Sequence, residues 1–235
     1  DISTTIDNLI PNTTYYVRVF ITNNLGEFYG NEMEFTTNEG CDVVYLDDNG
    51  VTIKAYPCAE IGDVGTINGV QYTVVDREML EQMLLNDEDF TKVCTSRVTN
   101  MMRIFSLTVN QDITSAFNQD IGNWDVSNVT NMEGMFSVAT SFNKPIGNWD
   151  VSSVTNMSGM FFEALLFNQP IGNWDVSSVT EMRTMFAWTE FNQPIGNWDV
   201  SNVSDMVRMF EHTQFNQPIS SWNVSNVTTM WGMFN

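Results

Sequence analysis

The sequence predicts an α/β solenoid, in which short parallel strands and short helices alternate along a coil. The first observation is an internal repeat, because five tryptophans recur at intervals of 24 or 25 residues within closely similar segments. The second is that the hydrophobic period changes inside each segment from that of a strand to that of a helix. The third is that the repeats differ in length only in the loop after the predicted helix. The five tryptophans are Trp124, Trp149, Trp174, Trp198 and Trp222.

Each repeat opens with a segment that predicts a strand. In the second full copy, residues 146–151 alternate between apolar and polar side chains, so that Asn148 and Asp150 face away from the core. The other copies have the same two outward positions. We interpret these positions as a surface that contacts a partner, and they are Asn123, Asp125, Asn148, Asp150, Asn173, Asp175, Asn197 and Asp199.

The second half of each repeat predicts a short helix. Residues 154–161 place apolar side chains at helical spacing, and Ser152 stands where it can cap such a helix. In the preceding copy, Thr130 and Glu133 have the spacing of a capping box. A unit this small cannot bury its apolar face alone. We therefore expect about six units in residues 93–235 to stack, with their tryptophans and paired methionines in the core.

The aspartates Asp125, Asp150, Asp175 and Asp199 would form a column of like charges in this arrangement. Three roles fit such a column. Each carboxylate can accept hydrogen bonds from the turn that follows it, near serines such as Ser127 and Ser152. The column can instead bind calcium through its oxygen atoms. It can also meet a basic partner surface.

Residues 39–92 predict a small α+β module that caps the first repeat. Two hairpins turn at Asn49 and Asn68, each of which is followed by glycine. Residues 76–89 then carry apolar side chains on one face of an amphipathic helix. Such a module covers the core that a bare end of the array would expose.

Composition excludes several classes of function. The chain of 235 residues has a formal net charge of −20, which repels nucleic acid and anionic membrane surfaces. No apolar run approaches the roughly 18 residues that span a bilayer, so we expect no membrane insertion. The single histidine, His212, has no neighbouring catalytic or ligand pattern. We therefore expect neither an enzyme nor a cofactor.

Three cysteines, Cys41, Cys58 and Cys94, fit one disulfide with one thiol left over. We expect Cys58 to pair with Cys94, which closes a loop around the start of the repeats. Three buried free thiols are the alternative.

Residues 1–38 resemble the closing strands of a fibronectin type III domain, which predicts a partial β-sandwich. The sequence alternates through this segment and turns near Asn23 and Gly26. Because the earlier strands are missing, we expect the chain to be part of a longer protein. The residues that carry the resemblance are Leu9, Pro11, Thr13, Tyr15, Val17 and Val19.

Residues 93–235 resemble the repeat of the BspA-like leucine-rich-repeat surface proteins. The resemblance rests on the segment FNQPIGNWDVSxVTNM and on the lead-in GTINGVQYTVVDREML. It implies a leucine-rich-repeat-like coil in an extracellular protein of the bacterial cell surface, with a role in adhesion and protein binding. The partner would be a protein or matrix macromolecule.

Two other functions remain open. The near-identity of the repeats favours a structural spacer or a filament that associates with itself, without a specific ligand. A polysaccharide ligand would need exposed aromatic side chains, and Trp188 and Trp231 are the tryptophans outside the repeated column.

Overall fold

The computed structural model describes residues 13–36, 40–106 and 115–235, and its regular elements are mainly β. They are small antiparallel sheets, one of which adds a short parallel strand, together with a single α-helix in the described residues. The α/β solenoid that the sequence predicts is therefore wrong. The chain divides into two compact units, residues 1–42 and residues 43–235.

The first unit consists of two antiparallel pairs, β1 with β4 and β2 with β3. The turn between Asn23 and Gly26 joins β2 to β3, as predicted. The side chains of β2, β3 and β4 are exposed, so these strands give no evidence of a fibronectin-like sandwich. Leu9 and Pro11 lie outside the described residues. The strands are β1 (Thr14–Val17), β2 (Phe20–Asn23), β3 (Gly26–Tyr29) and β4 (Met33–Thr36).

The second unit begins with two hairpins, which are β5–β6 and β7–β8. Asn49 and Asn68 lie in their turns, as predicted, and Asn68 has a φ of 51° that suits a tight hairpin turn. The short strand β9 then pairs with β8 in parallel. The strands are β5 (Val44–Leu46), β6 (Ile53–Ala55), β7 (Val64–Ile67), β8 (Val70–Val74) and β9 (Val93–Cys94).

The helix α1 (Arg77–Leu85) follows β8 and confirms the amphipathic helix. Asp76 caps it by accepting a hydrogen bond from the backbone N–H of Met79. Leu80 and Leu84 are buried on the face that meets the repeats. Of two short 3₁₀ helices, η1 (Phe90–Lys92) lies just before the first, degenerate repeat and η2 (Ile104–Ser106) lies at its end.

Residues 117–235 consist of turns and isolated bridges, with no strand or helix. Two tight turns interrupt the predicted strand. In the first, the backbone N–H of Trp149 donates to the carbonyl of Ile146, and in the second, the backbone N–H of Val154 donates to the carbonyl of Val151. The predicted helix also fails, because its sixth residue has a left-handed φ, which is 59° at Gly159 and 51° at the equivalent Thr184.

The capping predictions for this region are therefore wrong as well. No helix begins after Ser152, and its hydroxyl instead donates to the carboxylate of Asp150, at 2.6 Å. No helix begins at Thr130, and Glu133 lies in a turn, so they do not form a capping box. The side chain of Thr130 donates to the carbonyl of Thr99 in the preceding repeat.

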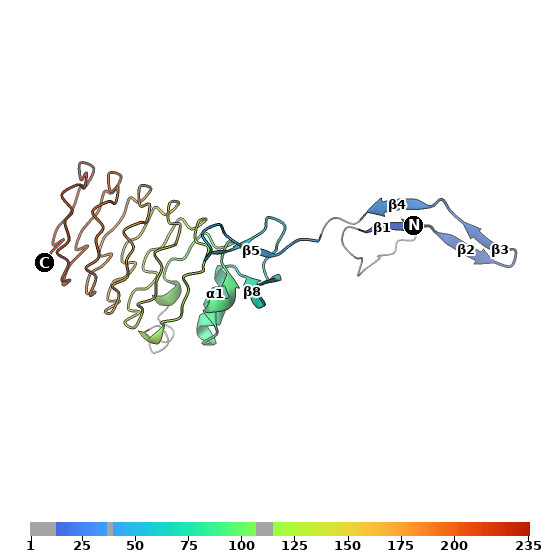
Figure 1. Ribbon diagram of the computed structural model, residues 1–235, viewed down its shortest axis with the longest axis horizontal. Helices are drawn as coiled ribbons and strands as arrows, with labels where there is room; N and C mark the ends of the chain where they lie inside the picture. The colour runs from blue at the N-terminus through green and yellow to red at the C-terminus, as the bar shows by residue number, and fades with distance from the viewer. Residues whose placement is uncertain (1–12, 37–39, 107–114) are drawn as a thin grey trace. The chain divides into compact units, whose positions relative to one another are not determined.

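One hydrophobic core runs through the second unit, from Val75 to Met233. The five repeated tryptophans are buried, as predicted, and so are the repeated methionines except Met230. Neighbouring tryptophans stack almost in parallel, with interplanar angles between 2° and 8° from Trp124 to Trp198. Figure 1 shows the repeats side by side, with α1 and the hairpins at the N-terminal end of the row.

Hydrogen bonds join each repeat to the next at several points. A single parallel bridge links each pair of neighbours, as between Asn156 and Glu181. Each full repeat begins with a phenylalanine followed by an asparagine. The side-chain oxygen of this asparagine accepts a hydrogen bond from the backbone N–H of the equivalent asparagine in the next repeat, as Asn143 does from Asn168. These asparagines therefore form a ladder that ties successive repeats together. We call residues 93–235 the repeat array.

The predicted disulfide between Cys58 and Cys94 does not form. Cys94 is a buried free thiol, whereas Cys41 and Cys58 are both disulfide-bonded. Burial raises the pKa of the Cys94 thiol. The thiol of Cys94 donates to the carbonyl oxygen of Ile53 in β6, at 3.4 Å. Cys94 therefore lies where the first repeat packs against β6.

Candidate binding surface

The strand β6 lies on the edge of the array where the Asn and Asp positions of the first repeats meet. The backbone N–H of Ile53 donates to the carbonyl of Asn123 at 2.9 Å. The backbone N–H of Ala55 donates to the hydroxyl of Ser96 at 3.0 Å. The chain therefore covers the beginning of this edge with one of its own extended segments.

Asp125 is buried, with 4% of its surface exposed, which corrects the prediction that all four aspartates face solvent. Its carboxylate accepts hydrogen bonds from the hydroxyls of Ser96 and Ser127. Burial lowers the pKa of the neighbouring Lys54 in β6, but the hydrogen bond to Asp47 and the charge of Asp125 raise it by more. The charge of Asp125 thus acts on a basic residue of β6.

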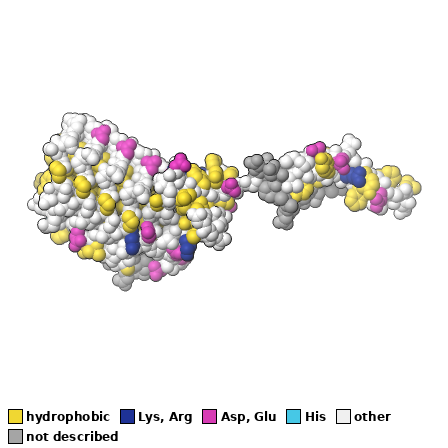
Figure 2. Space-filling view, in the orientation of Figure 1, with side chains coloured by type: hydrophobic (Ala, Val, Ile, Leu, Met, Phe, Trp, Pro, Cys, Tyr) yellow, Lys and Arg dark blue, Asp and Glu magenta, His cyan; other side chains and the backbone are white. Residues whose placement is uncertain are grey.

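The other three aspartates, Asp150, Asp175 and Asp199, are exposed. Each carboxylate accepts a hydrogen bond from the backbone N–H of the serine two residues later, as the first of the three roles requires. These serine hydrogen bonds lower the pKa of Asp175 and of Asp199, so both carboxylates remain ionised well below neutral pH. Figure 2 shows acidic side chains in a row along one edge of the array.

The four asparagines also differ between the covered and uncovered repeats. The side chain of Asn123 donates to the carbonyl of Thr91, at 3.2 Å. Asn148, Asn173 and Asn197 are exposed. Within the described residues, the backbone carbonyls of these three asparagines accept no hydrogen bond. The carbonyl of Asn123 accepts a hydrogen bond from Ile53, whereas the three equivalent carbonyls have no such donor among the described residues.

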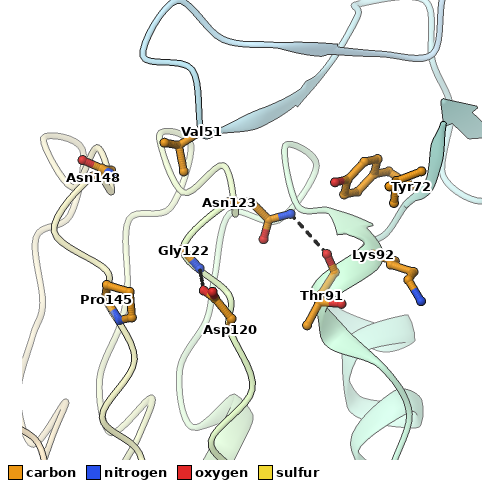
Figure 3. A pocket seen from close by; sticks show the side chains of 10 residues that line it. Val51, Tyr72, Thr91, Lys92, Asp120, Gly122, Asn123, Pro145 and Asn148 are labelled. Carbon is orange, nitrogen blue, oxygen red and sulfur yellow. Dashed lines mark hydrogen bonds between the residues drawn. The ribbon is translucent and has the colours of Figure 1, made fainter. Parts of the chain in front are cut away.

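A groove follows the same edge. Near β6 it has a volume of about 430 Å³. In Figure 3, Val51 lies between Asn123 and Asn148, and Tyr72 lies on the far side of Asn123. A second stretch, of about 380 Å³, lies over the later repeats and is lined by Pro170, Gly172, Asn173, Pro194, Gly196, Asn197 and Pro218.

Sequence reasoning identified the asparagines of this groove but missed the residues from outside the array. Val51, Tyr72 and Lys92 line it because the hairpins pack on the first repeat, and no local sequence pattern indicates that packing. Asp120 also lines it, and here a signal existed: the later repeats have proline at this position. The carboxylate of Asp120 accepts from the backbone N–H of Gly122.

The other hypotheses for this surface find little support in its geometry. The described residues contain no group of three or more His, Cys, Asp or Glu side chains that could hold a metal ion. His212 packs against the exposed Trp188, with 4.0 Å between ring centroids. Trp188 and Trp231 are not among the residues that line the groove.

Replacing Asp175 with alanine is expected to lower the free energy of unfolding by about 0.5–1.5 kcal/mol at neutral pH, through loss of the turn hydrogen bonds. Asparagine keeps an acceptor, as Asn223 does in the last repeat, so the Asp175→Asn variant should lose less.

The pH dependence of this effect has a defined sign. Because the folded pKa of Asp175 is lowered, its contribution is present above the unfolded pKa of about 3.9 and is lost as pH falls through the folded value. Urea unfolding at neutral and acidic pH measures both effects. Equal stability of Asp175→Ala and the unchanged protein at neutral pH would contradict the turn role.

Comparison with known proteins identifies one family. A family model described as "Mycoplasma protein of unknown function, DUF285" matches residues 76–189 and 165–235. No curated protein and no solved structure matches the chain. In the part of the chain that the structure describes, no helix is both long enough and apolar enough to span a bilayer.

Proposed function

This chain belongs to the family described as "Mycoplasma protein of unknown function, DUF285", and we propose that it is a non-catalytic bacterial cell-surface protein that binds a protein or matrix macromolecule. The partner lies along the uncovered edge of the array, at Asn148, Asp150, Asn173, Asp175, Asn197 and Asp199.

One observation carries the proposal most directly. The same Asn and Asp positions recur on successive repeats, and the chain's own strand covers only the first of them. The three later carboxylates are exposed, and each is held in place by its serine. A row of fixed, unneutralised carboxylates attracts a basic partner and orients it.

Two further features support the extracellular location. Cys41 and Cys58 are disulfide-bonded, and disulfides persist mainly in oxidising surroundings outside the cytosol. The repeat sequence also resembles that of the BspA-like surface proteins, a resemblance that extends over residues 93–235.

The proposal predicts that adhesion depends on the exposed aspartates. Beads that carry the full chain should bind to a layer of matrix proteins, and the double variant Asp150→Ala/Asp175→Ala should lose most of this retention. Removal of the two charges weakens both encounter and specificity. Bead retention under flow measures the effect.

A matched control removes two acidic side chains elsewhere. Glu163 and Glu190 lie in the loops after the Met-x-x-Met-Phe segments of their repeats, away from the groove residues. The variant Glu163→Ala/Glu190→Ala should retain beads normally. Equal losses in the two variants would reduce the effect to net charge and would contradict binding at the Asn–Asp edge.

The near-identity of the repeats favours a second candidate, a spacer or filament that associates with itself. Sedimentation velocity over a range of concentrations tests it. Assembly that is unaffected by Asp150→Ala/Asp175→Ala, together with no retention of beads, would favour this alternative.

A further inference from the structure

The contacts of β6 show how an extended chain fits the edge of the array. Ile53 bonds to Asn123 in the first full repeat, and Ala55 bonds to Ser96 in the repeat before it. These two donors stand two residues apart on β6 and reach neighbouring repeats, one at a backbone carbonyl and the other at a serine hydroxyl four positions later in its repeat. In the other direction, Val51 lines the groove together with Asn148 of the next repeat. Val51, two residues before Ile53, therefore lies beside the next repeat, where the chain's own segment leaves the edge.

The spacing of the repeats on this side agrees with a period of two residues. The tryptophan that follows each asparagine stacks on the next with ring centroids 6.4–6.5 Å apart. A strand rises about 3.2–3.4 Å per residue, so two residues span roughly 6.4–6.8 Å. An extended chain can therefore meet successive repeats in the same register, without stretching or slipping.

The uncovered repeats also offer the acceptors that such a chain needs. The carbonyls of Asn148, Asn173 and Asn197 are equivalent to the Asn123 carbonyl, which accepts from Ile53. Among the described residues they have no donor. The exposed amide side chains beside them can both donate and accept, which matches the N–H and C=O groups of a backbone.

The charges on this edge favour a basic chain. Lys54, between Ile53 and Ala55, lies in the field of Asp125 and forms an ion pair with Asp47 at 3.2 Å. Asp150, Asp175 and Asp199 repeat the Asp125 position without a cation within ion-pair distance in the described residues. One basic side chain per repeat would match them.

We propose that an extended segment of a partner protein, with Lys or Arg at every second residue, binds along the Asn148–Asp199 edge and continues the line of β6. Its backbone N–H groups donate to the Asn148, Asn173 and Asn197 carbonyls, and its basic side chains meet the three exposed aspartates. This inference rests on the proposed function, because it names the kind of partner that the same edge takes.

A polysaccharide fits the edge less well. The groove over the later repeats is lined by proline, glycine and asparagine, and it has no aromatic ring on which a sugar could stack. Tyr72 is the aromatic residue of the groove near β6, and it lies beside the repeats that the chain's own hairpins already cover.

The test uses the full chain and a fluorescent peptide of alternating Thr and Lys, blocked at both ends. Anisotropy should show saturable binding, and Asp150→Asn/Asp175→Asn should weaken it by about tenfold through loss of two charge pairs. Asparagine preserves the turns, as Asn223 does. The control Glu163→Gln/Glu190→Gln loses the same charge and should bind as the unchanged chain does.

Two further peptides test the two-residue period. A peptide with the same composition but with lysines in adjacent pairs should bind several-fold more weakly, and one with Glu in place of Lys should not bind. Equal binding of the alternating and paired peptides would overturn the inference, since net charge would then suffice. Binding of a soluble neutral polysaccharide without binding of the peptide would also overturn it.

The result also separates this inference from the proposed function. If beads adhere through Asp150 and Asp175 while the alternating peptide fails to bind, the extended-segment inference is wrong and the adhesive function stands. If neither beads nor peptide depend on these residues, both are wrong.

Discussion

Replacing Trp174 with alanine is expected to lower the free energy of unfolding by about 3–5 kcal/mol, the usual cost of a large cavity in a core. Trp174 is 3% exposed and stacks on Trp149 and Trp198 at 6.5 Å on either side. Its ring N–H also donates to the carbonyl of Ile146 in the preceding repeat, at 3.1 Å. The substitution therefore removes packing on both neighbours and one of the two hydrogen bonds to that carbonyl, which keeps the bond from the backbone N–H of Trp149.

Trp188 provides the matched control, because it is the same residue type in the same repeat array but 45% of its surface is exposed. Trp188→Ala should change the free energy of unfolding by less than about 1 kcal/mol. Denaturant unfolding monitored by circular dichroism measures both variants. If Trp174→Ala costs no more than Trp188→Ala, the tryptophan column does not hold the repeats together.

Trp174→Phe separates the two contributions. Phenylalanine keeps much of the stacked area and loses the ring N–H, so the remaining cost, apart from a smaller loss of volume, measures the bond to Ile146. We expect Trp174→Phe to lose less stability than Trp174→Ala, because the lost ring hydrogen bond contributes only about 0.5–1.5 kcal/mol and the Ile146 carbonyl keeps its bond from the backbone N–H of Trp149.

The sequence predicted which side chains form the core better than it predicted the backbone that carries them. Trp149 and Met157 are buried because periodic apolar residues must be removed from water wherever the chain turns. The same spacing fits a strand and helix as well as a series of tight turns. The left-handed backbone at Gly159 rules out the helix, but Thr184 and Arg208 share that conformation. Residue type therefore did not reveal it.

The candidate surface was predictable in part for a similar reason. The outward positions of Asn148 and Asp150 follow from alternation inside one repeat. The burial of Asp125 follows instead from the packing of β6, which lies 70 to 72 residues earlier in the chain. The cysteine pairing failed for the same cause, because long-range packing decides which sulfurs approach each other. Cys94 faces Ile53 and Ser96, so its thiol is buried away from a partner.

Replacing Gly147 with alanine is expected to destabilise the array by about 1–3 kcal/mol, the range for a core that must accept an extra methyl group. A Cβ at Gly147 would lie 2.6 Å from the backbone carbonyl oxygen of Pro170 in the next repeat. Backbone cannot move aside as a flexible side chain can. The two repeats must therefore separate, which also disturbs the stacking of Trp149 on Trp174.

Glycines at the equivalent positions meet the next repeat in the same way, so the effect belongs to the stacking and not to one loop. The Cβ of an alanine at Gly122 would lie 2.7 Å from the Pro145 carbonyl oxygen, and one at Gly196 would lie 2.7 Å from that of Pro218. Gly122→Ala and Gly196→Ala should therefore destabilise the chain to a similar extent.

The last repeat supplies the control, because it has Ser220 where the earlier repeats have glycine, and this serine is exposed. Ser220→Ala should leave the unfolding midpoint unchanged, whereas Gly147→Ala should lower it. Gly147→Ala could lower the stability and still bind the alternating peptide with unchanged anisotropy. That result would mean that the two repeats separate without moving the Asn148 carbonyl. Unchanged stability in Gly147→Ala would instead mean that neighbouring repeats are not packed this closely, and the two-residue register with an extended partner would lose its basis.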